Sequence, residues 1–238
     1  MSFEISGLYV RMAAAYVAPM LAATFLLSEP QVCDRPMERP IRYRDLVRDP
    51  RFVHSWLFMF INISCGLCLI PLARQMIENG GTDYSESVIA IAVFCSGMMN
   101  FVGRVFFAWW SDRLSRRVNV LLAILFVSFG VTAFSVFPVV AGLTLFVINA
   151  CYGGGFSTMP SILYEAYGVR NVSKAFGTVL TAWGVAGLVG NQVSMFVSDW
   201  LGFGYDGVMV LLAAACLLNI LNVLSLSRAL REPPPIGD

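Results

Sequence analysis

One arginine lies within one of the most apolar stretches of the sequence. Arg104 has large apolar residues on both sides, and Asn100 stands four residues earlier, on the same face if the stretch is helical. An arginine at the centre of a lipid-crossing helix costs about 2.5–3.5 kcal/mol on insertion scales, so it usually faces protein, water or a bound partner. Because a guanidinium can bind a carboxylate through two hydrogen bonds, the pair predicts a site for a small organic anion. Alternatively, Arg104 extends to the membrane interface beside Trp109.

A polar and mostly basic segment follows this stretch. It contains Asp112, Arg113, Arg116 and Arg117. An aspartate at a helix–loop–helix junction can interact with the positive end of a helix, and the arginines can pair with Glu165 at the end of a later apolar run. We interpret these residues as a cytoplasmic gate that closes in one conformation and opens in another. The alternative is that the arginines only orient the chain in the membrane, a role that does not require Asp112.

The elements that position these residues are predicted to be membrane-spanning helices. Hydrophobic residues make up 58% of the 238 residues and charged residues 13%, about half the usual share in a soluble domain. Apolar runs of about 20 residues favour helices over the short alternating strands of a barrel. The predicted fold class is therefore all-α, a polytopic membrane helix bundle. The seven predicted spans are 6–27, 52–77, 85–109, 118–137, 139–164, 174–198 and 207–227.

Basic residues are distributed unequally among the predicted loops. The 28–51 linker holds six arginines, the 110–117 loop three, and the 165–174 turn and the C-terminal tail two basic residues each, while the intervening loops hold no lysine or arginine. Loops rich in lysine and arginine remain on the cytoplasmic side of a membrane. We therefore expect the N-terminus outside and the C-terminus in the cytoplasm. The sequence does not distinguish a plasma membrane from an organelle membrane.

The sequence lacks the usual patterns of catalytic and metal sites. Phosphate-binding loops, nucleophile–histidine pairs and metal-ligand clusters are absent, so we expect no enzyme activity, no cofactor, no metal and no nucleic-acid partner. Five of the six cysteines, including the pair Cys65 and Cys68, fall in apolar segments and are interpreted as small buried hydrophobes. The single histidine, His54, is expected near a membrane interface.

The first and last predicted spans share a pattern at an offset of 200 residues. Gly7, Val10 and the three alanines at 13–15 recur as Gly207, Val210 and the three alanines at 213–215. Transporters built from two parallel repeats have such equivalent helices. The alternative is a chance match, because alanine is common in membrane helices. We interpret 1–27 as the last helix of an N-terminal half, 28–51 as a basic cytoplasmic linker, 52–230 as a six-helix C-terminal half, and 231–238 as a tail. The expected partners are the lipid bilayer and a missing N-terminal half or second chain.

Two motifs carry a resemblance to a known family. The stretch from Asn100 through Gly103-Arg104 to Asp112-Arg113-x-x-Arg116-Arg117 resembles the loop between the eighth and ninth helices of the major facilitator superfamily, although Ala108 and Ser115 stand where glycines are usual. The stretch Tyr152-Gly-Gly-Gly-Phe-Ser-Thr-Met-Pro160 resembles the tenth helix. Together with 49–76, these segments look most like the oxalate/formate antiporter branch, which is related to the monocarboxylate transporters. The resemblance covers the sixth helix and the C-terminal half.

This resemblance implies a secondary active transporter, an antiporter or symporter that works by alternating access, with Arg104 in the substrate site. Asn62, Tyr152 and Trp183, polar or aromatic residues at mid-depth of their spans, could complete the site, or they could serve packing alone. Oxalate carriers are expected to have a lysine in the eleventh helix. Here the only lysine, Lys174, lies at the membrane edge, so a monocarboxylate, possibly with a coupled proton, is the expected substrate.

Two other readings fit part of the sequence. A seven-helix receptor would have the same terminal orientation, but it would leave the 110–117 junction and the offset of 200 residues unexplained. The other reading is a truncated, non-transporting fragment, because half of a two-lobed carrier lacks one wall of its cavity. In that case we expect no transport unless a second chain supplies the other half.

Overall fold

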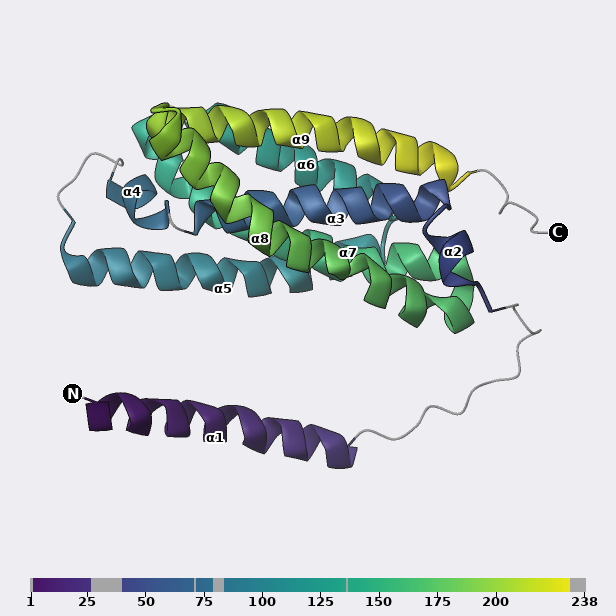
Figure 1. Cartoon of the computed structure of the whole chain (residues 1–238), viewed down its shortest axis with the longest axis horizontal. Helices are drawn as coiled ribbons and strands as arrows, with labels where there is room; N and C mark the ends of the chain where they lie inside the picture. The colour runs from purple at the N-terminus through teal and green to yellow at the C-terminus, as the bar shows by residue number, and fades with distance from the viewer. Residues whose placement is uncertain (1, 27–39, 71, 79–83, 136, 232–238) are drawn as a thin grey trace. The chain divides into compact units, whose positions relative to one another are not determined.

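The computed structural model describes residues 2–26, 40–70, 72–78, 84–135 and 137–231 (Figure 1). The chain divides into two compact units, Met1–Glu38 and Arg39–Asp238. The first unit contains α1 (Ser2–Leu26), which coincides with the predicted span 6–27. Within α1, Arg11 Nε donates a hydrogen bond to the Gly7 carbonyl at 3.1 Å, so this guanidinium is turned back along its own helix.

The second unit is a bundle of helices, and the described residues contain no strand. Its elements are α2 (Tyr43–Leu46), α3 (Pro50–Leu69), α4 (Ala73–Glu78), α5 (Glu86–Ser111), α6 (Val118–Ala133), α7 (Pro138–Val179), α8 (Thr181–Met195), the π-helix η1 (Phe196–Trp200) and α9 (Gly204–Ala229). This confirms the predicted all-α class.

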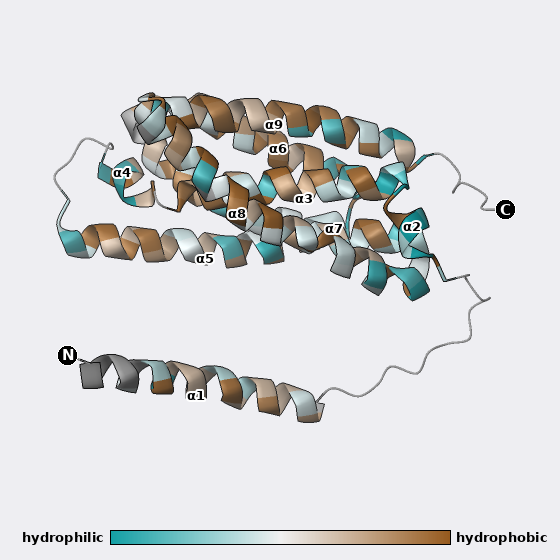
Figure 2. Cartoon of the chain, in the orientation of Figure 1, coloured by the Kyte–Doolittle hydropathy of each residue, from teal (hydrophilic) through white to brown (hydrophobic). Residues whose placement is uncertain are grey.

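Length and apolar composition identify the helices that can cross a membrane. Among the described residues there are four such stretches, Pro50–Leu69, Glu86–Ser111, Val140–Ser198 and Gly204–Ala229, and Val118–Ala133 is a shorter apolar helix. The third stretch covers the predicted span 174–198 and all but the first residue of the predicted span 139–164. Figure 2 shows hydrophobic residues along α3, α5 and α9, and polar residues gathered at the end of the unit that carries α2.

One predicted boundary is confirmed and others are wrong. The break expected at 165–174 is present as a kink inside α7, where Gly168 departs from helical geometry with φ 71° and ψ 176°. Glycine reaches such a positive φ without a steric penalty, so one residue provides the kink between the two predicted spans. The predicted span 52–77 is divided between α3 and α4, and α6 ends at Ala133, four residues earlier than expected.

Glycines allow α5 and α7 to pack with their backbones in contact. A Cβ atom on Gly103 would overlap the Ala150 carbonyl of α7, and one on Gly153 would overlap the Asn100 carbonyl of α5. Small residues at helix contacts permit this close approach inside membranes. These contacts form the α5–α7 seam, which joins the helix that carries Arg104 to the rest of the unit.

Most of the described cysteines are buried, as expected from the sequence. Cys65, Cys68, Cys151 and Cys216 are buried, whereas Cys95 is exposed, contrary to the interpretation as a buried hydrophobe; Cys33 lies outside the described residues. His54 is half-buried, and its Nδ1 lies 2.8 Å from Asn222 Oδ1 of α9. No group of three or more His, Cys, Asp or Glu side chains in the described part of the chain could hold a metal ion.

Candidate functional site

Arg104 is held by a chain of hydrogen bonds that runs from α5 to α7. Its Nε donates to Asn100 Oδ1 at 3.1 Å, and Asn100 Nδ2 donates to the Asn149 carbonyl at 3.3 Å. The bond to Asn100 turns the guanidinium away from the Trp109 end of α5. Since only Nε is engaged among the described residues, both Nη groups remain able to donate to a ligand. A guanidinium held in this way is ready to form a two-point contact with a carboxylate.

An aromatic surface adjoins this guanidinium. The Arg104 guanidinium carbon lies 5.1 Å from the centre of the Phe156 ring, within the usual range of a cation–π contact. Phe156 in turn meets Tyr152 edge-on, with ring centres 5.8 Å apart. The structure therefore brings Arg104, Asn100 and Tyr152 into one region at α5 and α7. Trp183 lies on α8 and is 54% exposed.

Asn62 occupies a different position from the other predicted site residues. Its side chain is only 6% exposed, and its Nδ2 donates to the Tyr152 carbonyl at 3.4 Å. It also packs against Gly155, where an added Cβ would come within 2.5 Å of Asn62 Nδ2. Asn62 thus supports α7 from behind the aromatic surface, and its amide points to the α7 backbone.

Two residues of this region were missed by reasoning from the sequence alone. Phe156 makes the aromatic contact with Arg104, and Asn149 offers its carbonyl to Asn100. Phe156 lies four residues after Tyr152, so the two share a helix face, and that spacing could have identified it. The role of the Asn149 carbonyl carries no signal in the sequence, because any residue at that position has a carbonyl.

Some of the residues predicted to form a cytoplasmic gate lie together. Arg117 Nε lies 3.2 Å from Glu165 Oε1, and Arg117 Nη2 lies 3.7 Å from Asp112 Oδ1. Arg113 instead stacks on the Trp109 ring at 3.6 Å, and Arg116 is exposed. Of the three predicted arginines, Arg117 is the one that links the α5–α6 junction to α7 among the described contacts.

A second ion-pair group stands at the other end of α5. Arg74 Nε contacts Glu78 Oε1 at 2.7 Å, and Arg74 Nη2 contacts Glu86 Oε1 at 2.6 Å. Glu86 begins α5, while Asp112 directly follows its last residue. The four-residue spacing of Arg74 and Glu78 could have suggested the first of these pairs, but the link to α5 required the structure.

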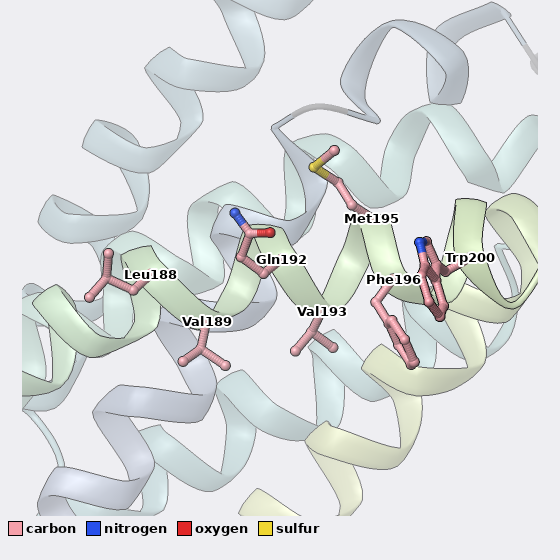
Figure 3. A pocket seen from close by; sticks show the side chains of 7 residues that line it. All are labelled: Leu188, Val189, Gln192, Val193, Met195, Phe196 and Trp200. Carbon is pink, nitrogen blue, oxygen red and sulfur yellow. The ribbon is translucent and has the colours of Figure 1, made fainter.

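A separate hollow lies on α8 and η1 and contains none of the predicted site residues (Figure 3). It encloses about 670 Å³ and is lined by Leu188, Val189, Gln192, Val193, Met195, Phe196 and Trp200. The described lining residues include no cation, and their polar groups are the Gln192 amide and the Trp200 indole N–H. We therefore do not assign a carboxylate to this hollow.

The ion pairs of Arg117 and Arg74 are solvent-exposed and therefore weak. The Arg117 and Glu165 side chains are 26% and 51% exposed, and such solvent-exposed pairs contribute about 0–1 kcal/mol. The Arg74 and Glu86 side chains are 57% and 77% exposed. Contacts of this kind can open and reform without a large thermodynamic cost.

Known proteins similar to this chain are membrane transporters. Residues 11–238 match the family described as Major Facilitator Superfamily. The chain is also similar to an uncharacterised MFS-type transporter, YhjX, of Escherichia coli (strain K12), with 22% identity over 157 residues, which are 64% of this chain and 38% of the relative. The chain thus spans less than two-fifths of that relative's length. With helices of membrane-crossing length and a family match over nearly all of its residues, the chain belongs to the major facilitator superfamily, whose members are membrane transporters and not enzymes.

Proposed function

We propose that the chain forms the C-terminal half of a secondary active transporter for small monocarboxylates, close to the oxalate/formate antiporter branch. The observation that carries the proposal is the geometry of Arg104, whose Nε is fixed by Asn100 while its guanidinium stands beside an aromatic surface. A carboxylate would accept from the two Nη groups, and the hydrocarbon part of the substrate would pack on Phe156 and Tyr152.

The charge of the site favours a monoanion over a dianion. In the eleventh helix, where oxalate carriers are expected to have a lysine, this chain has Trp183 and Gly184. The only lysine of the chain is engaged elsewhere, because Lys174 Nζ donates to the Ile41 carbonyl at 2.6 Å and lies 3.9 Å from the centre of the Tyr43 ring. A second carboxylate in the site would therefore lose hydration without gaining a partner.

Alternating access requires contacts that open and close at the two ends of this C-terminal half of the transporter. The Arg117–Glu165 pair and the Arg74–Glu86 pair stand at opposite ends of α5 and are proposed as these contacts. With the basic loops in the cytoplasm, the former would lie on the cytoplasmic side. The facing wall of the cavity would come from an N-terminal half. We propose α1 as the last helix of that half.

Labelled uptake tests the proposal. Proteoliposomes that contain the chain together with an N-terminal half are expected to accumulate acetate or lactate, and to prefer them to oxalate or succinate. The chain alone is expected to bind a monocarboxylate without moving it, and binding is measured as thermal stabilisation, which follows ligand occupancy. Preference for dicarboxylates, or a lack of stabilisation by every monocarboxylate, would contradict the proposal.

The proposed cytoplasmic contact should be weak and sensitive to salt. In a double-mutant cycle with Arg117→Gln and Glu165→Gln, we expect a coupling free energy of about 0.2–1 kcal/mol, because the pair is exposed. At 1 M salt, where the screening length is about 3 Å, the coupling should disappear. The measurement is the free energy of unfolding of the chain in one detergent at two salt concentrations. A coupling above about 2 kcal/mol would mean that the pair is a permanent structural contact. It would contradict a contact that opens in every transport cycle.

A further inference from the structure

We propose that the groove between α2, the start of α3 and residues 178–181 binds an anionic phospholipid, with the headgroup at the arginines of α2 and an acyl chain in the groove. This site is separate from the region around Arg104 and does not depend on the identity of the transported substrate. It rests on the proposed orientation only in that the lipid would come from the cytoplasmic leaflet.

The groove is apolar and open to its surroundings. It encloses about 230 Å³ and is lined by Val47, Phe52, Val53, Trp56, Thr178 and Thr181. Val47 and Val53 are 47% and 45% exposed, so a ligand would cover hydrocarbon that nothing in the second unit covers. The polar atom of Trp56 is already satisfied, since its Nε1 donates to Thr181 Oγ1 at 2.9 Å. The groove therefore offers an acyl chain contact area, with few donors or acceptors left for a polar ligand.

Positive charge borders the groove on the side of α2. Arg42, Arg44 and Arg48 are exposed, and Asp45 is the exposed acid among them. The neighbouring Asp49 does not cancel this charge, because it forms an ion pair with Arg51 at 2.6 Å in which the side chains are 4% and 11% exposed. Basic clusters directly beside a membrane helix attract anionic headgroups. Charge and apolar surface together thus fit a molecule with an anionic head and a hydrocarbon tail.

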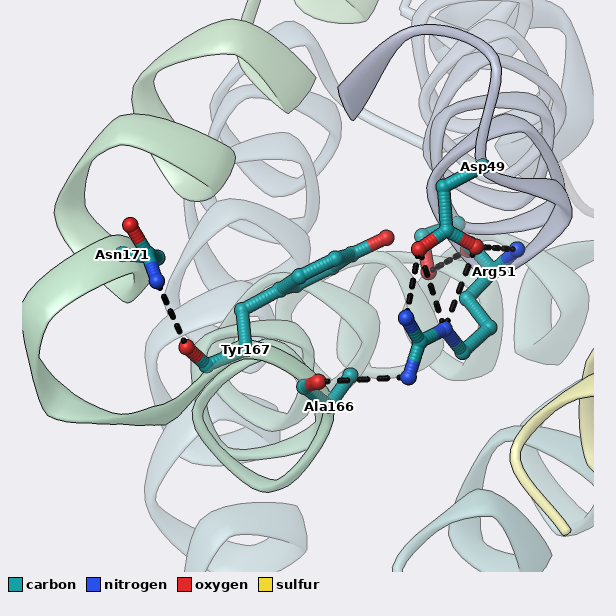
Figure 4. A network of polar contacts seen from close by, with 6 residues as sticks. Asp49, Arg51, Ala166, Tyr167 and Asn171 are labelled. Carbon is teal, nitrogen blue, oxygen red and sulfur yellow. Dashed lines mark hydrogen bonds and ion pairs between the residues drawn. The ribbon is translucent and has the colours of Figure 1, made fainter. Parts of the chain in front are cut away.

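The platform that carries these arginines is fixed before any ligand binds. A four-residue helix such as α2 is not stable by itself, but Leu46 is fully buried, and Ile41 N donates to Asn171 Oδ1 at 2.9 Å. Figure 4 shows the network that follows α2 in the chain, in which Arg51 bridges Asp49 and the Ala166 carbonyl of α7. A preformed site pays little ordering entropy when the lipid arrives.

Native mass spectrometry of the whole chain tests this site. After exchange into a neutral detergent with equal amounts of phosphatidylglycerol and phosphatidylcholine, the chain is expected to retain phosphatidylglycerol preferentially. The double variant Arg44→Gln/Arg48→Gln should retain it about tenfold less well, with phosphatidylcholine unchanged. The matched control is Arg113→Gln/Arg116→Gln, which removes the same charge from two exposed arginines of the α5–α6 junction and should retain wild-type selectivity.

A variant of the groove separates a lipid from a soluble anion. Thr178→Trp is expected to fill the groove and to reduce retention of phosphatidylglycerol, while all variants keep the wild-type elution volume in size-exclusion chromatography. Equal retention of the two lipids by the wild-type chain would overturn the proposal. So would an equal loss in the control pair, or displacement of phosphatidylglycerol by millimolar inorganic phosphate, since the latter would describe a site for an anion without a tail.

Discussion

Arg104→Gln is expected to abolish measurable binding of monocarboxylates by the chain. Glutamine removes the charge and the forked donors, and the loss of a hydrogen-bonded charge pair costs about 2–5 kcal/mol, or roughly 30-fold to several thousand-fold in affinity. Arg104→Lys should recover part of the affinity, because it restores the charge without the two-point geometry. The measurement is the thermal stabilisation of the chain by a series of acetate or lactate concentrations in one detergent.

Two further substitutions show whether the effect belongs to this guanidinium. Asn100→Ala should weaken binding by a smaller factor, since Arg104 stays charged but loses the acceptor of its Nε at 3.1 Å. Asn149→Ala is the matched control, because it removes an amide from α7 and leaves the backbone carbonyl that receives Asn100. Unchanged binding by Arg104→Gln, or equal losses in Asn100→Ala and Asn149→Ala, would remove Arg104 from the proposed site.

The contacts of the site that could be predicted from the sequence are those within a single helix. Arg104 and Asn100 are four residues apart in a long apolar run, and their hydrogen bond follows from helical geometry alone. The contact of Arg104 with Phe156 could not be predicted in this way. It depends on how closely α5 approaches α7, and that distance is set by which glycines of the two helices face each other.

The helices were predictable for a similar reason, and their ends were not. Apolar runs of membrane length identify the cores of α3, α5, α7, α8 and α9. The polar residues of 165–174 correctly predicted a break between two helices. The residue at which the chain kinks required the structure, because nothing in the pattern separates Gly168 from the many other glycines in the helices.

The position of Arg104 therefore depends on the α5–α7 seam, where two glycines face backbone carbonyls of the opposite helix. Gly103 directly precedes Arg104 and faces the Ala150 carbonyl, and Gly153 directly follows Tyr152 and faces the Asn100 carbonyl. Any widening of the seam would move the guanidinium away from Phe156 and from the α7 carbonyl that holds Asn100. Stability of α5 and geometry of the site are thus coupled through these two glycines.

Gly103→Ala and Gly97→Ala, one methyl group each on the same helix, should have effects of opposite sign. The Cβ at Gly103 would overlap backbone, which cannot rotate away, so we expect a loss of about 1–3 kcal/mol in the free energy of unfolding. The Cβ at Gly97 meets no atom within 4 Å, so alanine there should stabilise the chain by up to about 1 kcal/mol through its better helix propensity. Both are measured by denaturation in the same detergent, with monocarboxylate binding as a second readout that only Gly103→Ala should weaken. If both variants shift stability in the same direction, or if Gly103→Ala binds its ligand normally, the close α5–α7 seam does not position Arg104.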